Sequence, residues 1–280
     1  MTLKPLIVIA DDYAISPGVS RGILELAEAG RISGTGSMVT MPHWPEAAVA
    51  MKPLAGRFSV GLHLTLTDQK PLGAMPRLAP EGRFPTIGAL SRQANTGRLP
   101  IDEIAAEFDR QLDMFERHFG RQPDFIDGHQ HCQQLPGIRT LVIEACTTRL
   151  AAHGTWLRDA WDGIGNQIAR RSFEGAMVGW LGRGLHRDAQ RRGIKTNRGF
   201  TGVYGFGKVE WGAELPRMLK GAGENTMLMV HPGHPDEELA AVDSWVGPRE
   251  GEWASMMGEA FPRDLAQRGF RVATGAAFPG

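Results

Sequence analysis

Residues 6–12 read LIVIADD, an apolar run that ends in two adjacent aspartates. Short apolar runs bounded by turn residues are typical of buried parallel strands. The same pattern, an apolar run followed by a residue that handles metal ions or protons, returns three times. These later runs are FSVGL before His63, DFIDG before His129, and MLMV before His231. Because the loops after parallel strands share one face of an α/β fold, the pattern predicts a single active site.

Composition narrows the class of protein. The length of 280 residues fits one α/β barrel domain. Basic and acidic residues number 31 each, so net charge gives no attraction to nucleic acid or to an anionic membrane. Cys132 and Cys146 are too few for a disulfide framework, which indicates a reducing compartment. With no apolar stretch near the ~20 residues of a membrane span and no signal-peptide pattern, we expect a cytoplasmic protein.

Strand and helix patterns alternate along the chain. Ser16 is expected to cap a helix that begins at Pro17 and ends near Ala29. Further helices are expected at residues 45–51, 101–119, 137–152, 160–195, 209–219 and 252–268, and further strands at 35–41, 155–158 and 270–274. Residues 68–100 are rich in Pro and Gly, which predicts a long functional loop. The alternation predicts a single domain over residues 1–280, with a parallel sheet and helices outside it.

The segment 160–195 is unusually basic for a helix that also carries large apolar residues. Its cationic residues are Arg170, Arg171, Arg183, Arg187, Arg191, Arg192 and Lys195, beside Trp180, Leu181 and Leu185. Two interpretations remain open here. The segment is either an ordinary solvated helix face or part of a groove for an anionic or lipid-linked substrate.

Asp11 and Asp12 are the first candidates for chemistry. Two adjacent carboxylates repel each other, and burial at a strand end is costly unless a cation or a shared proton offsets it. Neighbouring side chains of an extended strand point to opposite sides, but a backbone that turns at the strand end can direct both into one pocket. One carboxylate would then bind a metal ion while the other takes a proton from water. The alternative is a turn or a helix-capping pair.

Histidines supply the candidate nitrogen ligands. His63 lies in the apolar run GLHL, where a packed core histidine is the alternative to a ligand. His129 and His131 are two residues apart, so in an extended chain both imidazoles face the same ion. Asp127 is expected to orient one of these two, or to act as a structural hydrogen-bond acceptor. Cys132 is either a soft metal ligand or a buried thiol.

His231 follows an apolar strand and precedes Pro232-Gly233. An imidazole titrates near neutral pH, which suits a general acid or base. His234 is expected to be more exposed. The joint recurrence of these groups at strand ends favours a metal-dependent hydrolase over coincidence.

Taken together, four segments resemble the YdjC-like carbohydrate deacetylases, a family with ChbG and HpnK branches. They are ADDYAISPG at 10–18, GLHLTLT at 61–67, IDGHQH at 126–131 and VHPG at 230–233, in the family's order. The segment KTNRGFTGVYG at 195–205 is similar to the family's substrate-loop region. Two positions depart from the family pattern. Tyr13-Ala14 stands where members often have Phe-Gly, and Gln133 where they often have a third histidine.

The resemblance implies a distorted (β/α) barrel and metal-dependent removal of acetyl from an N-acetylated sugar. It implies that Asp12, His63 and His129 bind one divalent ion, with Mg²⁺ or Zn²⁺ favoured. It further implies that Asp11 is the general base and His231 the general acid. A two-His, one-carboxylate set also admits Mn²⁺ or Fe²⁺.

The substrate is less specified by the sequence. Four tryptophans are expected near the mouth, each either stacking on a sugar or packing in the core: Trp44, Trp156, Trp161 and Trp211. The basic region at 160–195 slightly favours sugar-bearing hopanoid lipids as the substrate. An N-acetylglucosamine oligosaccharide such as a chitin-type disaccharide is favoured almost as strongly.

Two other classes stay in competition. An amidohydrolase or phosphoesterase barrel usually ends its first strand in His-x-His, whereas here the aspartate pair ends it. A non-catalytic sugar- or metal-binding module would not need all five chemical groups. Neither a nucleic-acid partner nor a transmembrane segment is expected, and a homodimer is the default oligomer.

Overall fold

The computed structural model of the chain describes residues 2–163, 165–166, 170, 173–204 and 210–275. The strands are β1 (Lys4–Tyr13), β2 (Gly34–Ser37), β3 (Ser59–Leu64), β4 (Phe125–Gly128), β5 (Trp156–Leu157), β6 (Gly199–Thr201), β7 (Thr226–Val230) and β8 (Phe270–Val272). The α-helices are α1 (Pro17–Glu28), α2 (Trp44–Met51), α3 (Ile87–Asn95), α4 (Ile101–Phe119), α5 (Ile138–Thr147), α7 (Phe173–Arg191), α8 (Trp211–Met218), α9 (Glu237–Val242), α10 (Pro248–Met257) and α11 (Ala260–Gln267). Two 3-10 helices are η1 (Lys52–Leu54) and η2 (His129–Gln134).

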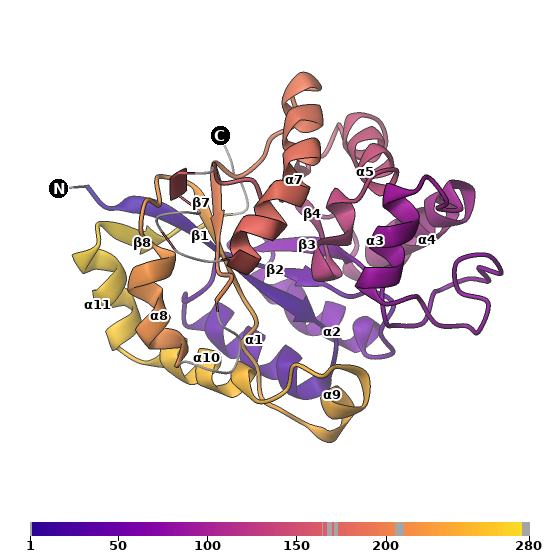
Figure 1. Cartoon of the computed structure of the whole chain (residues 1–280). Coiled ribbons are helices and arrows are strands. Elements are labelled where there is room, and N and C mark those ends of the chain that lie inside the picture. Colours follow the sequence, from indigo (N-terminus) through magenta and orange to yellow (C-terminus); the bar gives the residue numbers. More distant parts are fainter. Residues whose placement is uncertain (1, 164, 167–169, 171–172, 205–209, 276–280) are drawn as a thin grey trace.

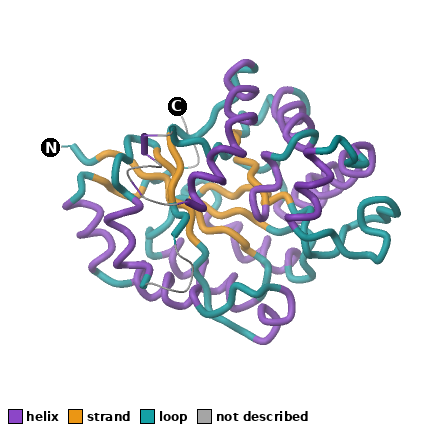
Figure 2. Tube along the Cα trace, viewed as in Figure 1, coloured by secondary structure: helices purple, strands orange, loops and turns teal. Residues whose placement is uncertain are grey.

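The strands form one curled sheet in the order β5-β4-β3-β2-β1-β7-β6, and β8 pairs with the first residues of β1. Every pairing in it is parallel. A single parallel bridge between Leu157 and Thr196 links β5 to the segment that leads into β6. Helices surround the sheet on the outside (Figures 1 and 2). The predicted α/β fold, a distorted barrel of parallel strands with outer helices, is confirmed.

The buried centre of the sheet is β1. Its residues Leu6 to Ala10 have no exposed surface, because β2 and β7 pair with it on either side and helices cover it. The turn into α1 forms as the sequence predicts. Ser16 is in extended conformation, its hydroxyl accepts a hydrogen bond from the amide of Val19, and Pro17 occupies the first turn. Within the described residues, no helix is long and apolar enough to cross a membrane.

Three local predictions were wrong. The helix expected at 252–268 is two helices, α10 and α11, which are separated at Gly258, where the backbone is extended. The loop expected at 68–100 contains α3, whose first turn Thr86 caps through its hydroxyl. Residues 129–131 are not extended, because β4 ends at Gly128 and η2 begins at once. Parts of the helices expected at 160–195 and 209–219 lie outside the described residues.

Candidate metal centre and active site

The carboxyl ends of β1, β3 and β4 bring the candidate ligands together. In β1 the register against β2 shifts between Ala10 and Tyr13, and Asp12 adopts a left-handed backbone with φ of 68°. This conformation is uncommon outside glycine, although aspartate tolerates it better than most residues. The turned backbone puts both aspartates of the pair in the wall of one cavity. The backbone therefore turns at the end of this strand, as the sequence predicts.

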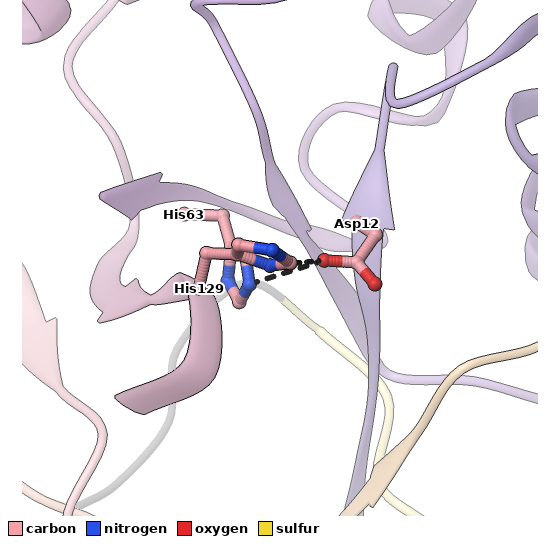
Figure 3. A group of neighbouring side chains, drawn as sticks. All are labelled: Asp12, His63 and His129. Carbon is pink, nitrogen blue, oxygen red and sulfur yellow. Dashed lines mark hydrogen bonds and ion pairs between the residues drawn. The ribbon is translucent and has the colours of Figure 1, made fainter. Parts of the chain in front are cut away.

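Asp12, His63 and His129 form a compact group (Figure 3). One ligand atom from each lies within 4.8 Å of the others. The atom Oδ1 of Asp12 is 3.0 Å from Nδ1 of His129 and 3.4 Å from Nε2 of His63. All three residues are buried. One carboxylate oxygen and two imidazole nitrogens are a donor set that suits a divalent ion with further positions left open, so these residues fit the metal that the sequence implies.

Asp127 orients His63, and not His129 or His131 as expected. The two residues are direct partners in the register of β3 and β4, and Oδ1 of Asp127 lies 2.7 Å from Nδ1 of His63. This contact leaves Nε2 of His63 directed toward Asp12, as a carboxylate partner does for many metal-bound histidines. A Cβ atom at Gly36 would lie 2.8 Å from the His63 ring and 2.9 Å from Asp127. Gly36 in β2 therefore makes room for this pair.

The buried charges near His63 favour a cation. Burial by itself lowers the pKa of His63, but Asp127 and Asp11 outweigh it and raise that pKa to about 10. The pKa of Asp12 is well below its ordinary value, because Arg249 and His129 outweigh its burial. The group is thus stabilised by positive charge, whether a proton or a metal ion supplies it.

Arg158 holds the other aspartate of the pair. It follows β5, has no exposed surface, and donates to both oxygens of Asp11, with Nη–Oδ distances of 2.7 and 2.5 Å. Its Nη2 also lies 2.6 Å from Oδ2 of Asp127. Burial raises the pKa of Asp11, but Arg158 outweighs it and brings that pKa to about 2. Asp11 is therefore ionised at neutral pH. Its oxygens each retain a lone pair beyond the one that Arg158 uses.

Arg249 of α10 holds Asp12 from the opposite side. Its Nη2 lies 2.7 Å from Oδ2 of Asp12 and 2.7 Å from Oδ2 of Asp243, and its Nε donates to the carbonyl of Trp245. The guanidinium is fully buried. Because Arg249 takes Oδ2 of Asp12, the oxygen that faces the histidines is Oδ1.

His231 follows β7 and lies near Asp11, with Nε2 3.8 Å from Oδ2 of that aspartate. Its backbone amide donates to Oε2 of Glu252, at 2.6 Å. The other oxygen of Glu252 accepts from the hydroxyl of Tyr204, at 2.5 Å. His231 is therefore fixed through its backbone by a buried carboxylate. His234 contacts Glu25 instead, and its side chain is as exposed as that of His231, 20% against 19%.

Two sequence candidates stay outside the ligand group. His131 has a left-handed backbone with φ of 60°, so the extended backbone assumed for His129 and His131 is wrong, and His131 is not part of the group of Asp12, His63 and His129. It lines the cavity, and burial lowers its pKa to about 3, so it is neutral. Cys132 is a buried thiol that donates to the carbonyl of Leu64, and burial raises its pKa. Gln133 is fully buried.

The cavity over these residues has a volume of about 390 Å³. Its polar floor includes both aspartates, His63, His129 and His231, and its apolar wall is formed by Met177, Val178, Val203, Met229 and Trp245. A second hollow of about 380 Å³ shares His129 and Asp243 with it. The expected sugar-facing tryptophans do not line either space. Trp44, Trp156 and Trp211 are buried in packing, and Trp161 stacks near Arg183.

The sequence interpretation missed Arg158, Arg249, Glu252 and Trp245. Arg158 offered a usable signal, because it ends the strand expected at 155–158 as the other site residues end theirs. The remaining three lie in or beside α10, where helical periodicity gives no sign of a role.

Comparison with known proteins gives a consistent result. A model of the family described as YdjC-like protein matches residues 5–267. The chitooligosaccharide deacetylase of Klebsiella pneumoniae (strain 342) is 30% identical over 275 residues, which cover 97% of this chain and 98% of that protein. The enzyme of the same name from Serratia marcescens is 41% identical over 143 residues, 50% of this chain and 54% of the relative.

One solved structure resembles the whole chain. It is a protein from Enterococcus faecalis V583 whose name refers to cellobiose-phosphate cleavage, with a TM-score of 0.74 and 21% sequence identity. The match covers 97% of each chain. At this identity the likeness bears on the fold alone.

Proposed function

The chain belongs to the YdjC-like family, and from this premise we propose that it is a carbohydrate deacetylase that uses one divalent metal ion. The observation that carries the proposal is the buried group of Asp12, His63 and His129 beside the ionised Asp11. Together they supply a metal-ligand set and a proton acceptor at the floor of one cavity.

Asp12, His63 and His129 would hold the ion, which when bound acidifies water and polarises a carbonyl oxygen. Asp127 engages Nδ1 of His63 and leaves Nε2 turned toward Asp12, so Nε2 would be the ligand atom of His63. Mg²⁺ and Zn²⁺ are the ions that we propose first. The carboxylate of Asp12 would contribute Oδ1, since its other oxygen accepts from Arg249.

Asp11 is the proposed general base. Arg158 fixes its carboxylate and keeps it ionised, so a free lone pair is ready to accept a proton from the attacking water. His231 is the proposed general acid. An amine is a poor leaving group, so the nitrogen of the cleaved amide must be protonated, and His231 faces Asp11 across 3.8 Å. Glu252 fixes the backbone from which that imidazole extends.

The proposed substrate is an N-acetylglucosamine oligosaccharide, in line with the curated relatives named chitooligosaccharide deacetylase. A sugar-bearing lipid such as a glycosylated hopanoid is the second candidate. Its support is the apolar wall of the cavity, where Met177, Val178 and Met229 lie close to the polar floor.

The test is acetate release from N,N′-diacetylchitobiose and from an N-acetylglucosaminyl lipid, with chelator and with added Mg²⁺ or Zn²⁺. Metal-dependent release from either compound is expected, and the preferred compound assigns the substrate class. Bound metal without acetate release from either would overturn the proposal in favour of a phosphoesterase or a binding module.

The roles of the two aspartates are tested by conservative variants. Asp11→Asn should abolish turnover and leave the metal content nearly unchanged, whereas Asp12→Asn should lose the metal. Metal content is read by elemental analysis of the purified protein. Equal metal loss in both variants would contradict the division between base and ligand.

A further inference from the structure

Helix α7 presents an exposed face that the catalytic chemistry does not use. Met177 and Trp180 are 52% and 68% exposed, which is unusual for side chains of this size. Among the described residues, only Val49 and Ile101 join them as large exposed hydrophobics. Two of these four thus lie one helical turn apart on the same element.

Cationic residues continue this face toward the end of the helix. Residues 177, 180, 183, 187 and 191 are spaced by three or four positions, so they lie along one side of α7. All five are exposed, whereas Leu185 and Ala189 on the other side have no exposed surface. The exposed face of α7, defined by these five residues, therefore consists of a methionine, a tryptophan and three arginines.

One acidic residue next to this face, Asp188, is already paired. Asp188 lies at its border, where it accepts from Arg139 at 3.0 Å and contacts Arg191 at 3.6 Å. Arg183 lies over the ring of Trp161, at 5.7 Å from its centroid. The chain as a whole has no net charge, so this face is a local concentration of positive charge.

The face is continuous with the catalytic cavity. Met177 belongs to both, and its neighbour Val178 lines the cavity wall. In Figure 1, α7 runs from the centre of the molecule, near β7, to its periphery. An apolar pair beside a row of arginines is the arrangement by which helices lie on a membrane surface, with rings in the interface and cations on acidic headgroups.

We propose that the exposed face of α7 docks the protein onto an anionic lipid surface, with the mouth of the catalytic cavity at that surface. This function goes beyond the deacetylase chemistry and does not depend on it. The zero net charge of the chain excludes long-range attraction to a membrane, but an arginine row acts within a Debye length, about 10 Å at ordinary ionic strength. The charge pattern favours lipid over a purely acidic polymer, because an acidic polymer would not need Trp180 and Met177.

The proposal is tested with the full chain and vesicles, without any substrate. The protein is co-sedimented with vesicles of phosphatidylglycerol and phosphatidylcholine in equal parts, and with vesicles of phosphatidylcholine alone. Binding to the first is expected, with a decrease as salt rises. Arg187→Gln should weaken it about five-fold, and the triple change of Arg183, Arg187 and Arg191 to Gln roughly a hundred-fold. Trp180→Ser should also weaken it, because the ring is lost from the interface.

Arg117→Gln on α4 removes the same charge from another exposed helix and should bind as the unchanged protein does. Circular dichroism and thermal unfolding check that each variant is folded. Three results would overturn the proposal: no binding to anionic vesicles, equal binding to both vesicle types, or undiminished binding by the folded triple variant. Capture by a soluble polyanion without vesicle binding would likewise reject the lipid assignment.

Discussion

Replacing Arg158 by Met removes the guanidinium that joins Asp11 to Asp127 and leaves the space filled by an apolar chain. In the unchanged protein this group makes two contacts to Asp11 and one to Asp127, all of 2.7 Å or less, with no exposed surface. The variant therefore buries two carboxylates that have lost their main cation. Breaking a buried pair in this way typically costs about 3–5 kcal/mol of unfolding free energy.

The pH dependence of this loss follows from the pKa of Asp11. Burial raises this pKa, but Arg158, with smaller contributions from His63 and His231, outweighs burial and brings it from 3.8 to about 2, a net shift that corresponds to about 2 kcal/mol of stability. Because the folded pKa is below the unfolded one, this contribution is present above pH 3.8 and is lost as the pH falls toward 2. Without Arg158, burial raises the pKa of Asp11, so the variant gains relative stability as acid protonates it. The difference in stability between the two proteins should narrow by about 2 kcal/mol or more on acidification.

Urea unfolding of both proteins, measured in steps from pH 7 down to the acid limit of the folded state, gives this difference. Arg121→Met is the matched control, because Arg121 also pairs with one aspartate through two nitrogens but its side chain is 29% exposed. Its loss should be about 1 kcal/mol or less. A difference for Arg158→Met that stays constant with pH, or that equals the control, would refute the assignment of the low Asp11 pKa to Arg158.

Three further results are expected at the metal centre. Asp127→Asn should weaken metal binding about 10–100-fold by titration calorimetry, because His63 loses the carboxylate that orients it; unchanged affinity would show that His63 needs no such partner. Gly36→Ala should cost about 1–3 kcal/mol of stability and also weaken metal binding, because its Cβ would collide with His63 and Asp127, whereas Gly88→Ala, in open space on α3, should be nearly neutral. Arg249→Met should unfold at a lower temperature than the unchanged protein when metal-free, yet gain more from added metal, because the ion then replaces the positive charge that Arg249 placed on Asp12. An equal thermal shift in both proteins would contradict this.

The sequence predicts those parts of the site that belong to strands. Asp11, Asp12, His63 and His231 each follow or end an apolar run, and the rule that parallel strands deliver their carboxyl ends to one face needs no tertiary information. The rule uses only local sequence, and for this reason the prediction of an extended backbone at His131 was wrong. The argument for two imidazoles on one side assumes extended backbone, but Gln130 and His131 both adopt left-handed conformations. Two consecutive residues with left-handed backbone, neither of them glycine, leave no clear signal in the sequence.

The pairing of the two arginines with the aspartate pair could not be predicted, because Asp11 and Asp12 are remote from them in sequence. Arg158 is 147 positions from Asp11, and Arg249 is 237 positions from Asp12. The sequence does predict that some cation lies beside Asp11 and Asp12, since two adjacent buried aspartates require compensating charge. It does not say which of many arginines provides it. Only the packing of α10 against α1 and the course of the chain after β5 select these two.

The two arginines also make different contacts to two aspartates that the sequence presents as equivalent neighbours. Arg158 engages both oxygens of Asp11, so that carboxylate is held rigid and ionised and both oxygens already accept from a guanidinium, although one also lies within 4.8 Å of ligand atoms of His63 and Asp127. Arg249 engages only Oδ2 of Asp12, and Oδ1 is left within 3.4 Å of both His63 and His129. A metal ion needs an oxygen beside the imidazoles, and a base needs a fixed, charged carboxylate close to the cavity floor. The pattern of cation contacts therefore favours Asp12 as ligand and Asp11 as base, independently of their order in the chain.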